Sequence, residues 1–475
     1  MYGDAGSREE NMGLSQRDAT RLSFRAFSLI SAAALLVVAT AGCETDAEPE
    51  DDGYPKTGEV TYFDHVKPIY KQQCNMCHQD GGVGPFKLDN LKDARAWGKA
   101  SANAVANRTM PPWLMTDDGS CNSYQDSRWL SEKEIDTIKK WVDLNMPAGD
   151  ASKDPGATAK LPGLEGANEY EIPVDYMPVD DNAKGGTWDD YRCFPIDLGL
   201  KKDRYVVAAD VIPGNAQIVH HVLAFAVGKD DLSLNLKTND DVLKGLQAKH
   251  TDRPGWPCYA AAGKDVRPGP MVIGWAPGSG VTNYPKSTGL KVRKDDILVV
   301  QIHYNVTGKP SQDRTKLRLK FVDSVKSEAW FVLHDWFLFG NIFAQQKHKL
   351  PAGLGEAPFT WKADRERFNF SLPYEAGDDF EIHGVFPHMH KRGKKMRMMV
   401  KQGDEKEVCA ADVHHWDFNW QRMYYFDKPI KLDKKTKITN TCTFDTSKDK
   451  SPVLPGFGTA EEMCLMGFYI SKPVK

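Results

Sequence analysis

The sequence lacks an excess of charge of one sign, and its one prominent apolar run is short. Its 475 residues hold 62 Lys and Arg against 65 Asp and Glu, a formal net charge of -3. There is no basic arm with interleaved aromatic residues, so nucleic acid is not expected as a partner. The apolar run at residues 29–39 is too short to span a bilayer. The length instead predicts two or three globular domains.

The apolar run is typical of a secretory signal, because Arg17, Arg21 and Arg25 precede it. It ends at Ala41-Gly42-Cys43, which resembles the cleavage and lipid-attachment site of bacterial lipoproteins, with Thr40 where Leu is usual. Ordinary cleavage to a soluble exported protein is the alternative.

We therefore expect residues 1–43 to be a signal peptide with a lipobox and lipidation at Cys43. Translation starts at Met1 or Met12. The expected location is the bacterial cell envelope, periplasmic or as an outer-membrane lipoprotein, with a lipid anchor as the only membrane attachment.

The nine cysteines divide into groups with different expected roles. Cys43 would carry lipid, and Cys74 and Cys77, which stand in a Cys-x-x-Cys-His sequence typical of heme attachment, would carry heme. The other six allow up to three disulfides in an exported protein, with fifteen connectivities: Cys121, Cys193, Cys258, Cys409, Cys442 and Cys464.

The chain predicts a multidomain protein, with a small α-helical cytochrome c-like domain followed by two all-β domains. Ser131 and Glu134 form a capping box before a helix whose apolar stripe includes Ile135, Ile138 and Trp141. After Tyr191 the pattern changes to short strands, at 204–209, 218–227, 296–306, 317–322 and 380–385. The expected divisions are an acidic tether at 44–56, the heme domain at 57–150, a linker at 151–185, and β-domains at 186–330 and 331–475.

Residues 74–78, Cys-Asn-Met-Cys-His, form a heme c attachment sequence. Two thioethers would fix the porphyrin and His78 would be one axial ligand. Met110, followed by two prolines and Trp113, is the predicted second axial ligand, with Met115 and Met146 as the alternatives. A redox dithiol or half of a zinc site is the other interpretation of Cys74 and Cys77.

Four separated segments supply soft and borderline metal ligands. They contain His220-His221, Gln301-Ile302-His303, His388-Met389-His390 and Glu462-Met463-Cys464. In an extended strand, alternate side chains share a face, so His388 and His390 point the same way. The adjacent His220 and His221 would need a twist, a bulge or ligation through the nearer ring nitrogen to share one metal.

The ligand types favour copper, because a thioether is soft and suits Cu(I). No clustered carboxylates accompany the histidines, which disfavours non-heme iron of the two-His, one-carboxylate type. Taken singly, each histidine is more often structural. His414-His415 has no evident partner residues and is interpreted as structural.

At these residues the chain resembles the copper type II, ascorbate-dependent monooxygenases, the family of peptidylglycine α-hydroxylating and dopamine β-monooxygenases. The resemblance covers residues 186–475. It implies two β jelly-roll domains facing a cleft, and it implies two coppers. His220, His221 and His303 would hold the electron-transfer copper, and His388, His390 and Met463 the catalytic copper that binds dioxygen. It also implies a Cys442–Cys464 disulfide.

Three departures from the family pattern bear on the substrate. Phe386 stands where peptide-processing members carry Arg, and Leu465 and Gly467 stand where they carry Asn and Tyr. The groups that bind a peptide carboxylate are therefore missing, which favours a small, more apolar substrate.

The favoured hypothesis is an exported copper- and heme-containing monooxygenase that hydroxylates a C–H bond with dioxygen. Heme would pass electrons to the three-His copper, from a redox protein donor, with ascorbate as another reductant. Two alternatives are a non-catalytic envelope copper-binding or electron-transfer protein on the same scaffold, and a heme-dependent sensor.

Overall fold

The computed structural model describes residues 57–80, 82, 84–156, 163–179, 189–258, 262–277, 279–305, 311–364, 379–456 and 460–474. The predicted signal peptide, Cys43 and the acidic tether lie outside these residues. Residues 53–475 form one compact unit. Within the described ranges, none of the helices is long and apolar enough to cross a bilayer.

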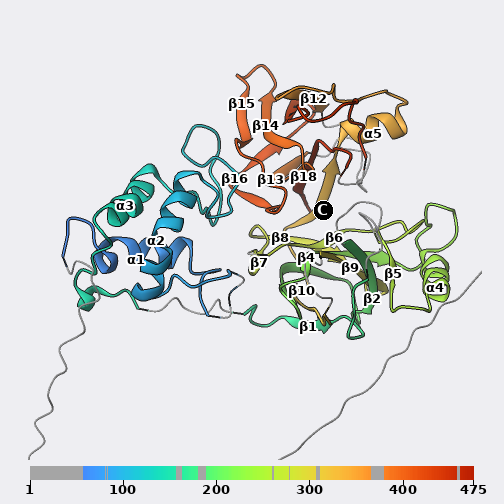
Figure 1. Ribbon diagram of the computed structural model, residues 1–475. Coiled ribbons are helices and arrows are strands. Elements are labelled where there is room, and N and C mark those ends of the chain that lie inside the picture. The colour runs from blue at the N-terminus through green and yellow to red at the C-terminus, as the bar shows by residue number, and fades with distance from the viewer. Residues whose placement is uncertain are drawn as a thin grey trace, which may run out of the picture. The chain divides into compact units, whose positions relative to one another are not determined.

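The first part of this unit is helical (Figure 1). Its elements are η1 (Tyr62–Val66), α1 (Lys67–Gln73), α2 (Leu91–Ala106), α3 (Glu132–Asp143) and η2 (Ala151–Lys153). The predicted capping box is present, because Ser131 accepts from the Glu134 backbone N–H and the Glu134 side chain accepts from that of Ser131. Ile135, Ile138 and Trp141 of α3 are buried in the core of this helical segment.

The remainder is mostly β-structure, as predicted, with two short helices, α4 (Asn239–Lys249) and α5 (Trp336–Phe343). The N-terminal sheet has the order β5-β2-β9-β4-β6. Its strands are β2 (Asp189–Asp197), β4 (Val219–Gly228), β5 (Trp256–Pro257), β6 (Met271–Trp275) and β9 (Asp296–Asn305). The C-terminal sheet has the order β12-β17-β14-β15. Its strands are β12 (Ala357–Asp364), β14 (Gly393–Gln402), β15 (Val408–Val413) and β17 (Thr436–Phe444).

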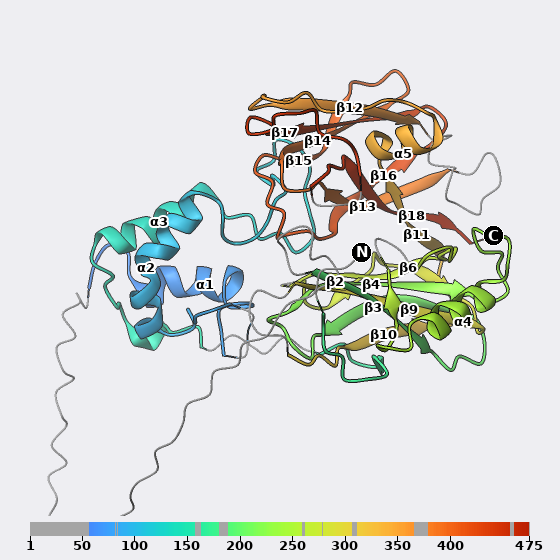
Figure 2. The same cartoon turned by 45° about the vertical axis from the view of Figure 1, so that its right-hand side comes forward.

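A third, central sheet runs through both β-domains in the order β1-β10-β3-β8-β11-β18-β13-β16, with β7 paired to β3. Its strands are β1 (Asn168–Glu171), β3 (Arg204–Ile212), β7 (Thr282–Asn283), β8 (Thr288–Val292), β10 (Lys316–Val322), β11 (Ser327–His334), β13 (Phe380–His388), β16 (Tyr424–Leu432) and β18 (Leu465–Pro473). Each β-domain is therefore a two-layer sandwich, with separate cores between its own sheet and its part of the central sheet. Figure 2 shows these layers.

Three predicted boundaries differ from the structure. Residues 163–179 are not only linker, because β1 pairs with β10, and Ile172 and Tyr176 are buried in the N-terminal core. The boundary at residue 330 falls inside β11, which pairs with β8 on one side and β18 on the other. Turn-rich composition near a boundary does not reveal backbone pairing with a distant strand, which explains both differences.

The third difference concerns residues 113–125, which were assigned to the heme domain. Trp113, Leu114, Met115 and Tyr124 are buried in the core of the C-terminal β-domain. The disulfide Cys121–Cys409 covalently joins this segment to β15. The helical segment is thus attached to the C-terminal β-domain by packing and by a covalent bond.

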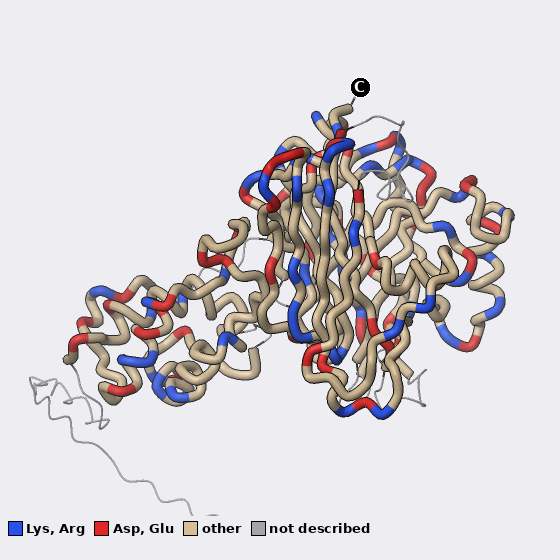
Figure 3. The backbone as a smooth tube through the Cα atoms, turned by 90° about the horizontal axis from the view of Figure 1, so that it is seen from above, with Lys and Arg blue, Asp and Glu red and all other residues tan. Residues whose placement is uncertain are grey.

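Charged residues of both signs are interspersed over this fold. In the view of Figure 3, Lys and Arg lie among Asp and Glu, many of them along the loops and strand ends. This distribution agrees with the nearly balanced composition.

Candidate metal centres

Three imidazoles converge on the N-terminal sheet. His220 and His221 lie on β4, and His303 lies on the neighbouring β9, where it is the cross-strand partner of His221. The β4–β9 register shifts between Val219 and His221. A bulge inserts one extra residue, which lets adjacent side chains turn toward the same face. The bulge considered from the sequence is therefore present where His220 and His221 need it.

The three Nδ1 atoms form a nearly equilateral triangle. The distances are 3.3 Å between His220 and His221, 3.1 Å between His220 and His303, and 3.3 Å between His303 and His221. A point equidistant from them lies about 1.9 Å from each, close to the roughly 2.0 Å of a metal–imidazole bond. In the described part of the chain, this is the one group of three or more His, Cys, Asp or Glu that could hold a metal ion.

The surroundings favour the neutral form of His221 and hold the His303 ring in place. Burial, followed by the neighbouring His303 and His220, lowers the pKa of His221 well below its usual value. A neutral ring is the form that binds a metal. The Tyr191 ring stacks on His303 with centroids 3.9 Å apart and planes 8° apart. The Cys193–Cys258 disulfide joins β2 to the residue that follows β5, and Gln301 Nε2 donates to the Cys258 carbonyl at 3.1 Å.

A second pair of imidazoles lies at the end of β13. The rings of His388 and His390 are 5.2 Å apart, with planes at 89°. His390 Nδ1 donates to the Glu461 carbonyl at 3.0 Å. His388 Nδ1 lies 2.5 Å from Gln421 Oε1. In both rings Nδ1 is engaged in an orienting hydrogen bond, so Nε2 is the nitrogen that would bind a metal. Burial lowers the pKa of His388 to about 3.

The strand register brings Met463 toward this pair. His388 is the cross-strand partner of Leu465, and continuing that register by two residues sets Met463 opposite His390. Met463 is 5% exposed and packs with Leu338 and Leu465. Met466, the alternative thioether, is fully buried in the C-terminal core instead.

A buried carboxylate supports this second set. Glu462 is fully buried, and it accepts from the backbone N–H groups of His390 at 2.9 Å and Arg392 at 2.7 Å. Burial raises the pKa of Glu462 to about 7. The Trp416 indole donates to the His390 carbonyl at 3.0 Å. Met463 is therefore preceded by a residue that holds the backbone around His390.

The Cys442–Cys464 disulfide is formed and links β17 to the residue after Met463. Among the other cysteines of the described residues, Cys121 pairs with Cys409 and Cys193 with Cys258, while Cys74 and Cys77 are free thiols. His414 is hydrogen-bonded to Asp412 at 2.6 Å, a partner that the sequence had not indicated.

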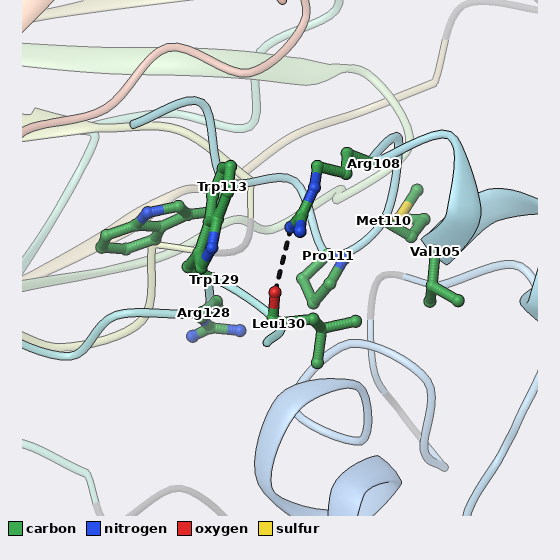
Figure 4. Close-up of a pocket in the computed structure, with 8 residues that line it drawn as sticks. All are labelled: Val105, Arg108, Met110, Pro111, Trp113, Arg128, Trp129 and Leu130. Carbon is green, nitrogen blue, oxygen red and sulfur yellow. Dashed lines mark hydrogen bonds between the residues drawn. The ribbon is translucent and has the colours of Figure 1, made fainter. Parts of the chain in front are cut away.

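In the helical segment, His78 Nδ1 donates to the Phe86 carbonyl at 3.0 Å, and its ring lies against that of Phe86. Burial raises the pKa of Cys74 to about 12. Met110 lines a small pocket with Arg108, Trp113 and Arg128 (Figure 4). The Trp113 ring itself packs against Tyr124 and Tyr424.

Sequence reasoning missed Tyr191, Phe418 and Gln421, each of which contacts a predicted ligand. No spacing rule joins these residues to the histidines, because the contacts cross between strands and loops.

Two family matches cover the β-domains. Residues 182–310 match the copper type II ascorbate-dependent monooxygenase, N-terminal domain, and residues 342–471 match the C-terminal domain of the same family. The chain belongs to the copper type II ascorbate-dependent monooxygenases. This agrees with the resemblance found in the sequence.

Among curated relatives, tyramine beta-hydroxylase of Caenorhabditis briggsae is 21% identical over 73% of this chain and 54% of that protein. Dopamine beta-hydroxylase of Rattus norvegicus is 21% identical over 62% of this chain and 46% of that protein. The chain thus spans about half the length of these relatives. A solved structure of infectious bursal disease virus, Gx strain, overlaps at 8% identity over 66% of this chain and 69% of that chain, with a TM-score of 0.17. A TM-score this low does not establish a shared fold.

Proposed function

We propose that this protein is a copper-dependent monooxygenase that hydroxylates a C–H bond of a small, apolar substrate with dioxygen. The observation that carries the proposal is the convergence of three Nδ1 atoms at 3.1–3.3 Å, in a family whose members are copper monooxygenases. One oxygen atom enters the product, and the other leaves as water at the expense of two electrons and two protons.

Two copper ions would supply one-electron storage and dioxygen binding. His220, His221 and His303 would hold one ion through Nδ1. His388, His390 and Met463 would hold the other, with the thioether favouring Cu(I). This chain's own contribution is orientation. Gln421 orients the imidazole of His388, and the Glu461 carbonyl orients that of His390. Glu462 holds the turn that runs from His390 to Arg392.

The residues around Met463 support an apolar substrate. Phe386 and Leu333 lie over Gly467, where an added Cβ would come within 3.0 Å of Phe386 Cβ and 3.1 Å of Leu333 Cδ2. Phe386 also packs against the cluster of Leu338, Met463 and Leu465. These side chains are all apolar and offer no positive group. They therefore suit an uncharged hydrocarbon or aromatic portion of a substrate better than a carboxylate.

Substitutions of Phe386 test the preference for an apolar substrate. Phe386→Arg should lower kcat/KM for apolar substrates, because it places a charge against Leu333 and Met463. Phe386→Leu is the matched control and should keep most of the activity. Oxygen consumption by copper-loaded protein across a panel of small C–H compounds measures both. A panel in which only carboxylate-bearing peptides react would contradict the proposal.

We further propose that residues 74–78 attach heme c, with His78 and Met110 as axial ligands. The His78 Nδ1–Phe86 bond supports this, because it leaves Nε2 as the iron-binding nitrogen. The raised pKa of Cys74 disfavours the redox dithiol, which needs a thiolate. Heme would supply single electrons to copper, from a redox protein donor, with ascorbate as a second reductant. Export to the bacterial envelope, with lipidation at Cys43, is part of this proposal.

His78→Ala tests the role of heme. It should remove an axial ligand without touching either set of copper ligands. Turnover with a protein electron donor should fall sharply, while turnover with excess ascorbate should persist. Metal analysis of the wild-type protein should find two coppers and one covalent heme per chain. One copper, or zinc in preference to copper, would contradict the two-site assignment.

A further inference from the structure

One loop touches the heme-attachment segment and both sets of copper ligands. This loop, residues 414–423, joins β15 to β16 and is called the junction loop here. Its side chains are turned to different parts of the molecule, and three of them carry the inference: Phe418, Trp420 and Gln421.

At one end the junction loop meets the heme-attachment segment. Trp420, Gln421 and Arg422 line one pocket together with Cys77, one of the two predicted heme thioethers. The same pocket is completed by Pro112 and Arg128 of the helical segment, and by Ala276 and Pro277. Those last two residues directly follow β6, the neighbour of the histidine-bearing β4. Three parts of the chain therefore meet at this pocket.

At the other end the loop meets the second set of ligands. The Gln421 side chain bridges two groups, because Oε1 lies 2.5 Å from His388 Nδ1 and Nε2 donates to the Phe418 carbonyl at 2.8 Å. Since the amide nitrogen is already a donor to a carbonyl, Oε1 must accept, and His388 Nδ1 carries the proton. Gln421 thus lines the Cys77 pocket and also holds His388.

Phe418 connects the two sets of ligands. Its ring centroid is 6.2 Å from that of His220, with planes 24° apart, and 6.4 Å from that of His390, with planes 79° apart. A single aromatic ring therefore lies against one ligand from each proposed copper centre.

Both flanks of the junction loop are held in place. The Thr116 N–H donates to the Asp412 carbonyl at 2.8 Å, and the Gln125 N–H donates to the Tyr425 carbonyl at 2.8 Å. The Cys121–Cys409 disulfide fixes the same contact covalently. The segment that continues from the heme-attachment region is thus anchored to the two strands that carry the loop.

We propose that the junction loop is the electron route between the attached heme and copper, with entry through Gln421 to His388 and passage through Phe418 to His220. The proposal rests on the proposed function and deepens it. Each transfer oxidises Fe(II) to Fe(III) and reduces one Cu(II) to Cu(I), with no proton or bond exchanged. Transfer rates fall steeply with distance, so a packed and hydrogen-bonded route is favoured. The sequence alone had suggested entry at the three-His copper, whereas the Cys77 pocket lies beside Gln421.

The test follows the heme absorbance, not turnover. Oxidised full-length protein, loaded with heme and copper, is mixed without oxygen with less than one equivalent of a heme reductant. Reoxidation of heme by copper in the same chain is first-order and independent of protein concentration. Copper-free protein supplies the blank.

In Gln421→Leu this reoxidation should slow by about 10–100-fold, the usual effect of losing a partner that orients a metal ligand. Gln421→Glu keeps an acceptor for His388 and should restore most of the rate. Phe418→Leu should leave this first-electron rate unaffected, and it should slow delivery of the second electron when two equivalents of the reductant are added. Asn419→Ala is the matched control, because that exposed side chain bonds only within the loop, to Asp417. Copper content and the Cu(II) spectrum of each variant show that slow transfer is not loss of metal.

The entry point is tested by removing one copper at a time. Fast reoxidation should disappear in Met463→Ala and persist in His303→Ala. The reverse pattern, an unchanged first-electron rate in Gln421→Leu, or an unchanged second-electron rate in Phe418→Leu would overturn the route. Failure of the proposed function would look different. The wild-type protein would then lack covalent heme, bound copper or oxygen consumption, whereas failure of the route alone leaves all three in place.

Discussion

The two sets of proposed copper ligands are held in different ways. His220, His221 and His303 lie within paired strands of the N-terminal sheet, where the ladder of backbone hydrogen bonds and one bulge set their positions. His388, His390 and Met463 lie at or beyond the ends of β13 and β18, where separate bonds from loop residues orient each ring. A sheet interior is rigid, whereas loop contacts can adjust. This contrast suits fixed electron storage in one centre and substrate entry at the other.

Removing the thioether ligand of the His388 centre should give the largest effect and leave the three-His centre intact. Met463→Ala should abolish turnover, a loss beyond the roughly 10–100-fold typical of losing a residue that orients a metal ligand. The three-His copper should stay loaded and remain reducible by ascorbate, because no residue of the N-terminal sheet changes. Oxygen consumption and copper content are the measurements. Met466→Leu is the control, as a core substitution of similar size, and substantial activity in Met463→Ala would point to Met466 as the ligand.

The disulfides near the two centres should differ in what their removal affects, which is copper affinity in one case and the free energy of unfolding in the other. Replacing Cys442 and Cys464 by Ala should weaken copper binding at the His388 centre by about 10–100-fold, because Cys464 adjoins Met463. Replacing Cys193 and Cys258 should mainly lower the free energy of unfolding, by about 2–4 kcal/mol. Copper titration and denaturant unfolding of both double variants check this. If the two double variants had equal copper affinity, the Cys442–Cys464 disulfide would have no special role in positioning Met463.

The C-terminal β-domain should also respond to pH through a buried carboxyl group. Asp335 caps α5 by accepting from the Leu338 N–H at 3.0 Å, and burial raises its pKa from 3.8 to about 7. Between these values the folded state binds more protons than the unfolded state, so stability should fall as pH rises from about 4 to about 7.

Asp335→Asn should remove this part of the pH dependence, while Asn keeps the helix cap. The change should amount to a few kcal/mol between pH 5 and pH 8, at about 1.4 kcal/mol per pKa unit. Thermal unfolding of both proteins at the two pH values measures it. Parallel pH profiles would show that Asp335 is not the group responsible.

The smallest expected effect concerns the ring stacked on the three-His centre. Tyr191→Leu should cost about 0.5–1.5 kcal/mol beyond the loss of buried area, the usual worth of an aromatic pair. The copper-free protein is the appropriate sample, with denaturant unfolding as the measurement. Copper affinity should change little, because the β4–β9 ladder still holds all three imidazoles. A large loss of affinity would mean that stacking, not the ladder, positions His303.

Local rules predicted the elements well. The capping box of Ser131 and Glu134 produced α3, and the five apolar strand patterns correspond to β3, β4, β9, β10 and β13. These features depend on neighbours in the sequence. The shared central sheet could not be predicted in this way, because pairing of β8 with β11 joins segments whose residues carry no mark of their partners.

The sequence by itself determined which side chains could bind a metal and which metal they suit. It also indicated that His220 and His221 need a twist, a bulge or ligation through the nearer ring nitrogen to share one metal. Tertiary structure alone decided that the irregularity is a bulge facing His303 and that Nδ1 atoms converge. It likewise decided that Gln421 and Phe418 meet the ligands. The physical reason is that ligand chemistry is a property of single side chains, whereas distances between them follow from strand register and packing across the chain.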